Sequence, residues 1–447
     1  MRNLRVRLTT NDFFRQFGIL LATVCSLLVV IPAFSQETDT ARSAGSDEIE
    51  MVGVPHHIGY RNRDLGLGGP STVQQQLEDD DVIRDPIYRF SRADQFFAPW
   101  QDTKKRVNQE HDLQLGFDYN ILSQGLSDSI GTEDGGTGGV LRAYGTWVLT
   151  RDDDKDFGRL IYNVNHRHRI FTDVAPANLG SQAGYIGVTG LLFSDVNLVL
   201  VDLNWQQSFN DAHTGLIVGR FDPNDYMGVL GYANPWTAFS NLAILLNPSV
   251  AFPDGSLGVG AGHRINDQWY FKASINDANG VITDLKSFKG GAEFFKWAEF
   301  GWTPAPDQHY LTNVHAVVWH VDEREQAGIP SAHGIMIGAN RTSDDQRWMG
   351  FVRAGWSKGS APIYNETYTV GLVRRVRRNS DEVGVAINWG DPPDSSLGSQ
   401  TTGELFYRLQ LSKGIAITPS VQLLKDPALN PTEDTILVWG IRFRLIL

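Results

Sequence analysis

The feature of this sequence that most constrains its fold is an alternation of apolar and polar side chains, in segments of about ten residues, from His111 onward. Turn-forming clusters such as Asp391-Pro392-Pro393-Asp394 separate the segments. Successive side chains of a strand point to opposite faces, so this period predicts β-strands with one apolar face. In the final segment one face consists of Leu437, Trp439, Ile441, Phe443, Leu445 and Leu447, and the other of Gly440, Arg442 and Arg444.

Two architectures produce such strands: a soluble sandwich or barrel with its apolar face inside, and a membrane barrel with its apolar face toward lipid. The second face carries Gly, Asn, Glu and Arg, which is typical of a polar lumen. A chain that ends on an apolar amphipathic strand leaves an aggregation-prone edge in a soluble protein, whereas in a barrel that strand closes the sheet. The pattern favours the membrane barrel, and a secreted soluble β protein remains the alternative.

Composition excludes several other classes of protein. A hydrophobic content of 41% and a mean hydropathy of −0.24 leave no room for a bundle of membrane helices. The 45 glycines and 11% aromatic residues, spread among aliphatic residues, exclude collagen-like repeats and wholesale disorder. We therefore expect an all-β protein, a transmembrane antiparallel β-barrel with a short N-terminal helix.

The N-terminus has the features of a secretory signal peptide over residues 1–35. Basic residues precede an apolar run from Phe17 to Ile31, and Ala33-Phe34-Ser35 supplies small residues for cleavage. The only cysteine, Cys25, lies in this segment, and a lipid anchor there is disfavoured because the apolar run continues beyond it. Removing four arginines and one aspartate takes the formal net charge from −12 to −15, the opposite of the charge expected for a nucleic-acid binder.

Composition divides the rest of the chain into three regions. Residues 36–99 are loop-like, with an acidic run from Glu78 to Asp81, and are expected to be a periplasmic segment that builds little core. A short helix is expected over residues 100–110, and the β-barrel over residues 111–447.

Several segments resemble the carbohydrate-selective porin family of bacterial outer membranes. They are residues 403–411 (GELFYRLQL), 417–423 (ITPSVQL), 426–431 (DPALNP), 219–226 (GRFDPNDY), the stretch through Asn247-Pro248 and Phe252-Pro253, and residues 100–119. The resemblance implies a 16-stranded barrel and a channel for small solutes. Residues 36–92 do not match the family's usual start, and the chain ends in Leu447 where such strands commonly end in Phe.

Two motifs have the spacing of catalytic or calcium-binding sequences, but the neighbouring residues that such sites require are missing. Gly355-Trp356-Ser357-Lys358-Gly359 has the G-x-S-x-G spacing of serine hydrolases, yet the segment after it is extended rather than helical. Asp152, Asp154 and Asp156 resemble a calcium loop, but Asn163 stands where the bidentate Glu belongs.

Two other patterns are also interpreted as structural and not as ligand-binding sites. His166 and His168 share a strand face without a third metal ligand nearby, which favours a rim position. Gly258, Gly260 and Gly262 lie in an alternating stretch with no helix to cradle a phosphate. We expect no catalytic residue, no metal and no cofactor.

The pore-lining candidates are the polar and aromatic residues expected on the inner face, namely Asn388, Glu404, Phe406, Arg408, Arg442 and Arg444. Charged groups can hydrogen-bond sugar hydroxyls, and an aromatic ring offers an apolar face to a pyranose; equally, these charges can solvate the lumen or pair with one another. The run Arg374, Arg375, Arg377 and Arg378 covers both faces of a strand. A lipid-facing arginine is costly, so the run is expected at a rim, in contact with lipopolysaccharide phosphates.

These observations predict an outer-membrane porin, exported by its signal peptide in a Gram-negative-type envelope, that passes small hydrophilic solutes passively with a preference for carbohydrates. A general or other-solute porin and a non-conducting secreted β-rich binding protein remain alternatives. The expected partners are sugars or other small solutes, outer-membrane lipid and lipopolysaccharide, the barrel assembly machinery and, in a homotrimer, copies of the same chain; nucleic acid is not among them.

Overall fold

The fold is that of a computed structural model, which describes residues 56–57, 67–84, 86–88, 91–151, 156–232, 234–377 and 380–447. The predicted signal peptide, residues 1–35, and most of the segment before Leu67 lie outside the described residues.

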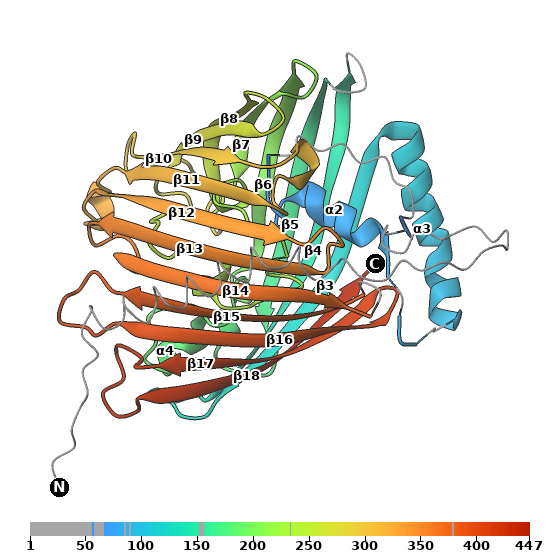
Figure 1. The fold of residues 1–447 in the computed structure, drawn as a ribbon. Helices are drawn as coiled ribbons and strands as arrows, with labels where there is room; N and C mark the ends of the chain where they lie inside the picture. The colour runs from blue at the N-terminus through green and yellow to red at the C-terminus, as the bar shows by residue number, and fades with distance from the viewer. Residues whose placement is uncertain are drawn as a thin grey trace, which may run out of the picture.

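Sixteen antiparallel strands form one closed barrel, which confirms the predicted fold class and strand number. Each strand pairs with its neighbours in the chain, and β18 closes the barrel by pairing with β3 (Figure 1). The strands are β3 (Leu113–Leu126), β4 (Gly135–Arg151), β5 (Phe157–Arg169), β6 (Asn197–Phe209), β7 (Thr214–Phe221), β8 (Ser256–Arg264), β9 (Trp269–Asp277), β10 (Phe294–Trp302), β11 (Asn313–Val321), β12 (Ala332–Thr342), β13 (Trp348–Lys358), β14 (Glu366–Val376), β15 (Asp381–Asp391), β16 (Gln400–Ser412), β17 (Ile415–Lys425) and β18 (Thr435–Ile446).

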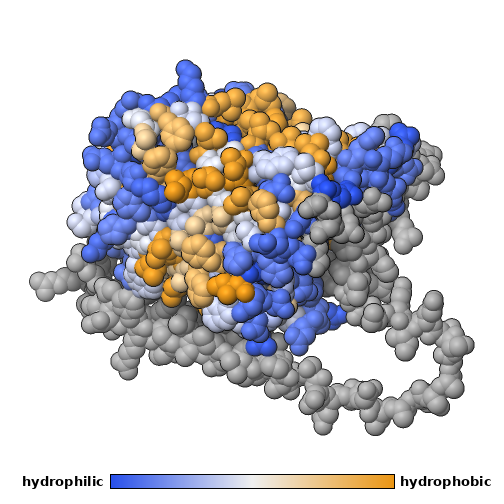
Figure 2. Space-filling view, turned by 90° about the horizontal axis from the view of Figure 1, so that it is seen from above, coloured by the Kyte–Doolittle hydropathy of each residue, from blue (hydrophilic) through white to orange (hydrophobic). Residues whose placement is uncertain are grey.

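The alternation in the sequence becomes an alternation between the outer surface and the interior. On β18, Trp439 and Ile441 are 55% and 52% exposed, whereas Arg442 and Arg444 are buried inside the barrel. Figure 2 shows apolar residues gathered across the middle of one outer face, with hydrophilic residues toward either end. Such an apolar band is the part of a barrel wall that faces lipid.

The two ends of the barrel differ in their connections. One end holds short links such as residues 413–414 and 210–213, together with Leu113 at the start of β3 and Ile446 at the end of β18. The other end holds the long connections 170–196 and 222–255. Short turns face the periplasm and long loops face outward in barrels of this kind. We call these ends the periplasmic end and the outer end.

In the described part of the chain the helices are few, and all but one are short. Helix α3 (Ser91–His111) lies beside β3 at the periplasmic end, with the Trp100 ring 5.6 Å from the ring of Phe117 (Figure 1). It begins nine residues before the predicted start and contains Pro99. The other elements are β1 (His56–His57), α2 (Val73–Asp81), β2 (Val82–Ile83), α4 (Pro176–Gln182), α5 (Leu242–Leu245) and the single 3₁₀ turns η2 (Pro223–Asp225), η3 (Pro306–Gln308) and η4 (Glu325–Ala327). Among the residues that the structure describes, no helix combines the length and hydropathy needed to cross a bilayer.

The expectation that residues 36–99 build little core is wrong for α2. Its side chains Val73 and Leu77 are buried against Tyr144 and Ile161 of the barrel wall. The helix begins at Thr72, whose hydroxyl accepts a hydrogen bond from the backbone of Gln75. Its polar composition hides this burial, because the helix packs into a polar lumen rather than an apolar core.

Candidate permeation site in the barrel lumen

The connection between β7 and β8, residues 222–255, folds into the lumen; we call it the inner loop. Asx turns shape it, because a short side-chain oxygen accepts a hydrogen bond from the backbone two residues on. Asp222 accepts from Asn224, Asn234 from Trp236, Asn241 from Ala243 and Asn247 from Ser249, at 2.9–3.1 Å.

Glu404 and Arg442, two of the predicted pore residues, anchor the inner loop to the wall. Glu404 accepts hydrogen bonds from the Ser240 backbone at 2.8 Å, from the Ser240 hydroxyl at 2.9 Å and from the Asn241 backbone at 3.0 Å. Arg442 donates to the backbone carbonyls of Pro235 and Ala238. Both side chains therefore hold the loop rather than extend into open water.

Phe406 anchors the same loop through apolar packing. Its ring is buried, with its centroid 4.8 Å from that of Phe239 and the two planes at 84°. Phe351 completes the cluster from β13. An edge-to-face pair of this kind fixes the position of the loop.

Arg353 is an anchor that the sequence interpretation missed. It is buried on β13 and donates hydrogen bonds to the carbonyls of Ile244 and Leu245, at the end of α5. Its position on the inner face follows from the alternation in Phe351-Val352-Arg353, and this signal could have identified it.

Arg444, a third predicted charge, binds the N-terminal segment instead. Its guanidinium lies 2.9 Å from Asp80 of α2 and 2.9 Å from Asp118 of β3. Arg142 of β4 completes the group by pairing with Asp118 and donating to Gln76. Helix α2 therefore lies inside the barrel near its periplasmic end (Figure 1).

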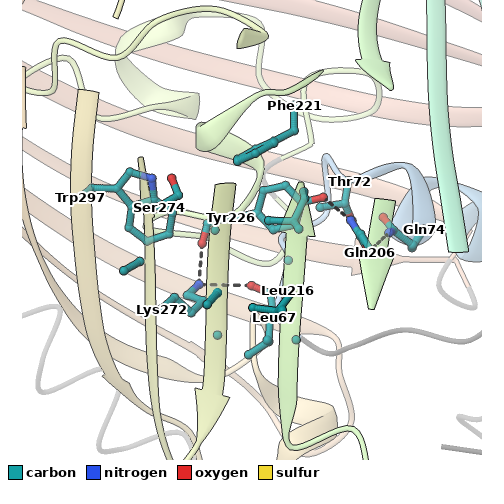
Figure 3. Close-up of a pocket in the computed structure, with 17 residues that line it drawn as sticks. Leu67, Thr72, Gln74, Gln206, Leu216, Phe221, Tyr226, Lys272, Ser274 and Trp297 are labelled. Carbon is teal, nitrogen blue, oxygen red and sulfur yellow. Dashed lines mark hydrogen bonds between the residues drawn. The ribbon is translucent and has the colours of Figure 1, made fainter. Parts of the chain in front are cut away.

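On the opposite wall, Lys272 of β9 holds both inserted segments. Its ammonium donates to the Leu67 carbonyl at 3.2 Å and to the Tyr226 carbonyl at 2.5 Å (Figure 3). Gln206 of β6 adds a second link, accepting from Gln74 and donating to the Tyr226 hydroxyl, both at 2.8 Å.

The two remaining predicted residues contact the wall itself. Arg408 donates to Gln410 at 3.2 Å and lies 3.5 Å from Glu382. Asn388 donates to the hydroxyls of Thr367 and Thr369 at 2.8 and 2.9 Å. All six predicted residues are thus on the buried inner face, but their role in lining the path of a solute stays a prediction.

A cavity lined by both polar and apolar side chains, with an empty volume of about 1130 Å³, lies between the inner loop and strands β5, β12 and β13. On one side of the cavity, three side chains of β5 form a row of hydrogen bonds. Arg167 donates to Asn165 at 3.3 Å, and Asn165 donates to Asn163 at 2.7 Å. Trp236 also lines the cavity. Within the described chain, the Arg167 Nε has no hydrogen-bond partner.

Carboxylates of the inner loop line the other side of this cavity. Burial raises the pKa of Asp222 to about 8, with Asp225 as the strongest neighbouring charge. Burial likewise raises the pKa of Asp225 to about 7, with Asp202 as the neighbouring charge. The cavity therefore offers hydrogen-bond donors and acceptors at neutral pH.

A second hollow, with an empty volume of about 1060 Å³, separates α2 from the wall formed by β14 and β15. Arg375 and Glu382 line it, with their charged groups 3.4 Å apart. Tyr232 of the inner loop lies 3.9 Å below the Arg375 guanidinium. This hollow reaches the periplasmic end, where Tyr310 and Gln346 border it.

The enzyme and metal motifs have no matching geometry in the described chain. Ser357 lies at the end of β13, and its hydroxyl donates to the Tyr364 carbonyl at 3.2 Å, so the serine is not on a strand-to-helix elbow. His166 and His168 contact each other at 3.2 Å, and His168 contacts Tyr119 at 3.0 Å. No cluster of three His, Cys, Asp or Glu side chains suited to a metal occurs among the described residues.

The other motifs are likewise parts of the wall or its turns. Gly258, Gly260 and Gly262 lie on β8. Asp156 accepts a hydrogen bond from the Ala212 backbone at 3.0 Å, while Asp152 and Asp154 lie outside the described residues.

The arginine run lies at the rim as predicted, but at the periplasmic end. Arg374 and Arg375 end β14, and Arg377 begins the short turn to β15; Arg378 lies outside the described residues. The expected contact of this run with lipopolysaccharide stays a prediction, and a position on a short turn at the periplasmic end does not favour it. Arg377 instead pairs with Asp381 at 2.8 Å.

Comparisons with known proteins agree with this architecture. Residues 327–445 match the sequence profile of the family described as carbohydrate-selective porin, OprB family. Porin AaxA of Chlamydia pneumoniae is 22% identical over 378 residues, which cover 78% of this chain and 84% of that protein. Porin AaxA of Chlamydia muridarum is 23% identical over 287 residues, or 59% of this chain and 60% of that protein.

Among solved structures, Pseudomonas putida OprB at high pH superposes with a TM-score of 0.64 at 13% sequence identity. The superposition covers 78% of this chain and 97% of OprB, and it establishes the fold. Residues 327–445 are thus similar to the carbohydrate-selective porin, OprB family, most of the chain is similar to porin AaxA, and the closed 16-stranded barrel has the fold of OprB.

Proposed function

We propose that this porin is a passive outer-membrane channel with a preference for carbohydrates, exported by the signal peptide of residues 1–35. The observation that carries the proposal is the group of polar side chains that line part of the cavity beside the inner loop. Amide groups of Asn163 and Asn165, the Arg167 guanidinium and loop carboxylates face a space of about 1130 Å³ there. Sugar hydroxyls both donate and accept hydrogen bonds, so they suit a surface that offers both.

The aromatic residue of the cavity supports the same class of solute. Trp236 belongs to the inner loop and is buried, and the Arg142 guanidinium lies 3.8 Å from its ring centroid. Phe252 lines the cavity as well. Apolar ring faces next to convergent polar groups are typical of small-molecule sites.

The preference is tested by swelling of liposomes that contain the purified protein. We expect glucose to enter faster than a polyether of similar mass, such as triethylene glycol dimethyl ether, because the polyether has no hydroxyl to donate. Equal rates of entry for the two solutes would contradict the carbohydrate preference and indicate a general porin. No swelling in either solute, from protein shown to be folded by heat-modifiable gel mobility, would contradict the channel itself.

A further inference from the structure

The segment that fills the periplasmic half of the lumen is acidic, whereas the wall that it covers is rich in arginine. The wall contributes four guanidiniums, from Arg142, Arg375, Arg408 and Arg444, which we call the arginine strip. Among the described residues, two wall carboxylates, Asp118 and Glu382, pair with the strip, so four guanidiniums face two wall carboxylates there.

Helix α2 supplies carboxylates at this place. Asp80 lies 2.9 Å from Arg444 and accepts a hydrogen bond from the Tyr144 hydroxyl. Asp79 lies 3.8 Å from Arg444 and pairs with Arg84, which follows the helix. The acidic run of the sequence thus occupies the position that an anionic solute would take on the strip.

The attachment of α2 to the wall is mainly polar. Only Val73 and Leu77 contribute to an apolar cluster with the barrel. Its side chains also form hydrogen bonds and ion pairs with the wall and its turns, such as Gln75 with Tyr310 at 2.6 Å and Gln74 with Gln206 at 2.8 Å. A segment held in this way can leave without breaking the sheet of the barrel.

We propose that α2 is a resident acidic plug over the arginine strip, and that its withdrawal opens an anion-binding constriction for small solutes bearing a carboxylate or phosphate group. The proposal rests on the function proposed above, since it requires a conducting barrel. In the plugged state Asp79 and Asp80 offset part of the positive charge of the strip, while Arg84 of the same segment pairs with Asp79. In the open state the positive charge of the strip concentrates anions in the lumen.

The test compares single-channel currents of the full mature chain with those of the D79N/D80N variant. A matched control, E433Q/D434N, removes two exposed carboxylates from the loop between β17 and β18 at the outer end. We expect D79N/D80N to raise the time-averaged conductance about threefold and to shift the chloride-to-potassium permeability ratio toward chloride by up to about tenfold. The control is expected to match the wild type.

A second variant distinguishes the effect of the plug on conductance from the effect of the arginine strip on selectivity. Adding R375Q and R408Q to D79N/D80N should keep the high conductance and remove the chloride preference, with folding of each variant checked by heat-modifiable gel mobility. Folded D79N/D80N with wild-type conductance and selectivity would overturn the plug while leaving the porin intact. A shift toward potassium would overturn the anion-binding strip. Absence of current from every folded variant would contradict the proposed channel instead.

Discussion

Glu404 of β16 and Ser240 of the inner loop lie 164 positions apart in the chain and meet through two hydrogen bonds, at 2.8 and 2.9 Å. This contact fixes the loop that narrows the lumen, because the same carboxylate also accepts from the Asn241 backbone. Glu404 is 2% exposed, so its hydrogen bonds are not replaced by bulk water. The inner loop is therefore fastened to the wall by a buried charge.

Replacing this carboxylate should loosen the loop. In E404Q an amide N–H₂ group takes the place of one acceptor and faces a backbone donor, so we expect the free energy of unfolding to fall by about 2 kcal/mol. The midpoint of heat-modifiable gel mobility measures this loss, and open-channel noise should increase with it. The exposed-loop variant E433Q serves as the control, and equal stability of E404Q and E433Q would contradict the anchoring role.

Phe406 is expected to act in packing and not in sugar contact. Its ring is buried against Phe239, so F406L, which shortens the side chain but keeps it apolar, should cost less stability than F406A. F406A should cost about 3–5 kcal/mol because it leaves a cavity. Glucose block of the current should be unchanged in F406L, and a weakened block at wild-type stability would show that the ring contacts the sugar.

Arg167 is expected to contact the solute directly. Its Nε lacks a hydrogen-bond partner among the described residues, and its guanidinium borders the cavity beside the inner loop. In R167Q a donor to sugar hydroxyls is lost, so glucose should block the current with about fivefold weaker affinity, corresponding to about 1 kcal/mol. The conservative variant R167K should retain part of the affinity. Unaltered block in R167Q would exclude this residue from the solute path.

Asp222 and Asp225 should make stability depend on pH. The folded protein raises their pKa values from 3.8 to about 8 and about 7, because burial and neighbouring carboxylates disfavour the ionised form. The folded state then binds more protons than the unfolded state between about pH 4 and 8, so stability falls as the pH rises through this window. Thermal midpoints between pH 5 and 9 measure the effect. The D222N/D225N variant should show a flatter profile, and a profile as steep as that of the wild type would assign the dependence to other groups.

The sequence predicted the barrel because the two-residue period is a local property of each strand. In the last strand, this period predicts that Trp439 and Ile441 lie on one face and Arg442 on the other, as the structure shows. The number of strands came from the family resemblance, and the closed barrel confirms it.

The partners of the inner residues could not be predicted in this way. The alternation of polar and apolar residues predicts that Glu404 and Arg444 face inward. Their partners, Ser240 and Asp80, belong to an inserted loop and an inserted helix. Such long-range insertions leave no period in the sequence. The polar run of α2 therefore predicts a loop-like segment that builds little core, although most of its side chains are buried in the lumen.

The central claim is that the lumen is a conducting path that binds carbohydrate. Single-channel current of the detergent-purified mature protein in a planar bilayer tests it most directly, with glucose titrated against triethylene glycol dimethyl ether. We predict stepwise currents that glucose reduces saturably and the polyether does not. Stepwise currents that respond equally to both solutes would contradict the carbohydrate preference. Absence of current from folded protein would contradict the channel.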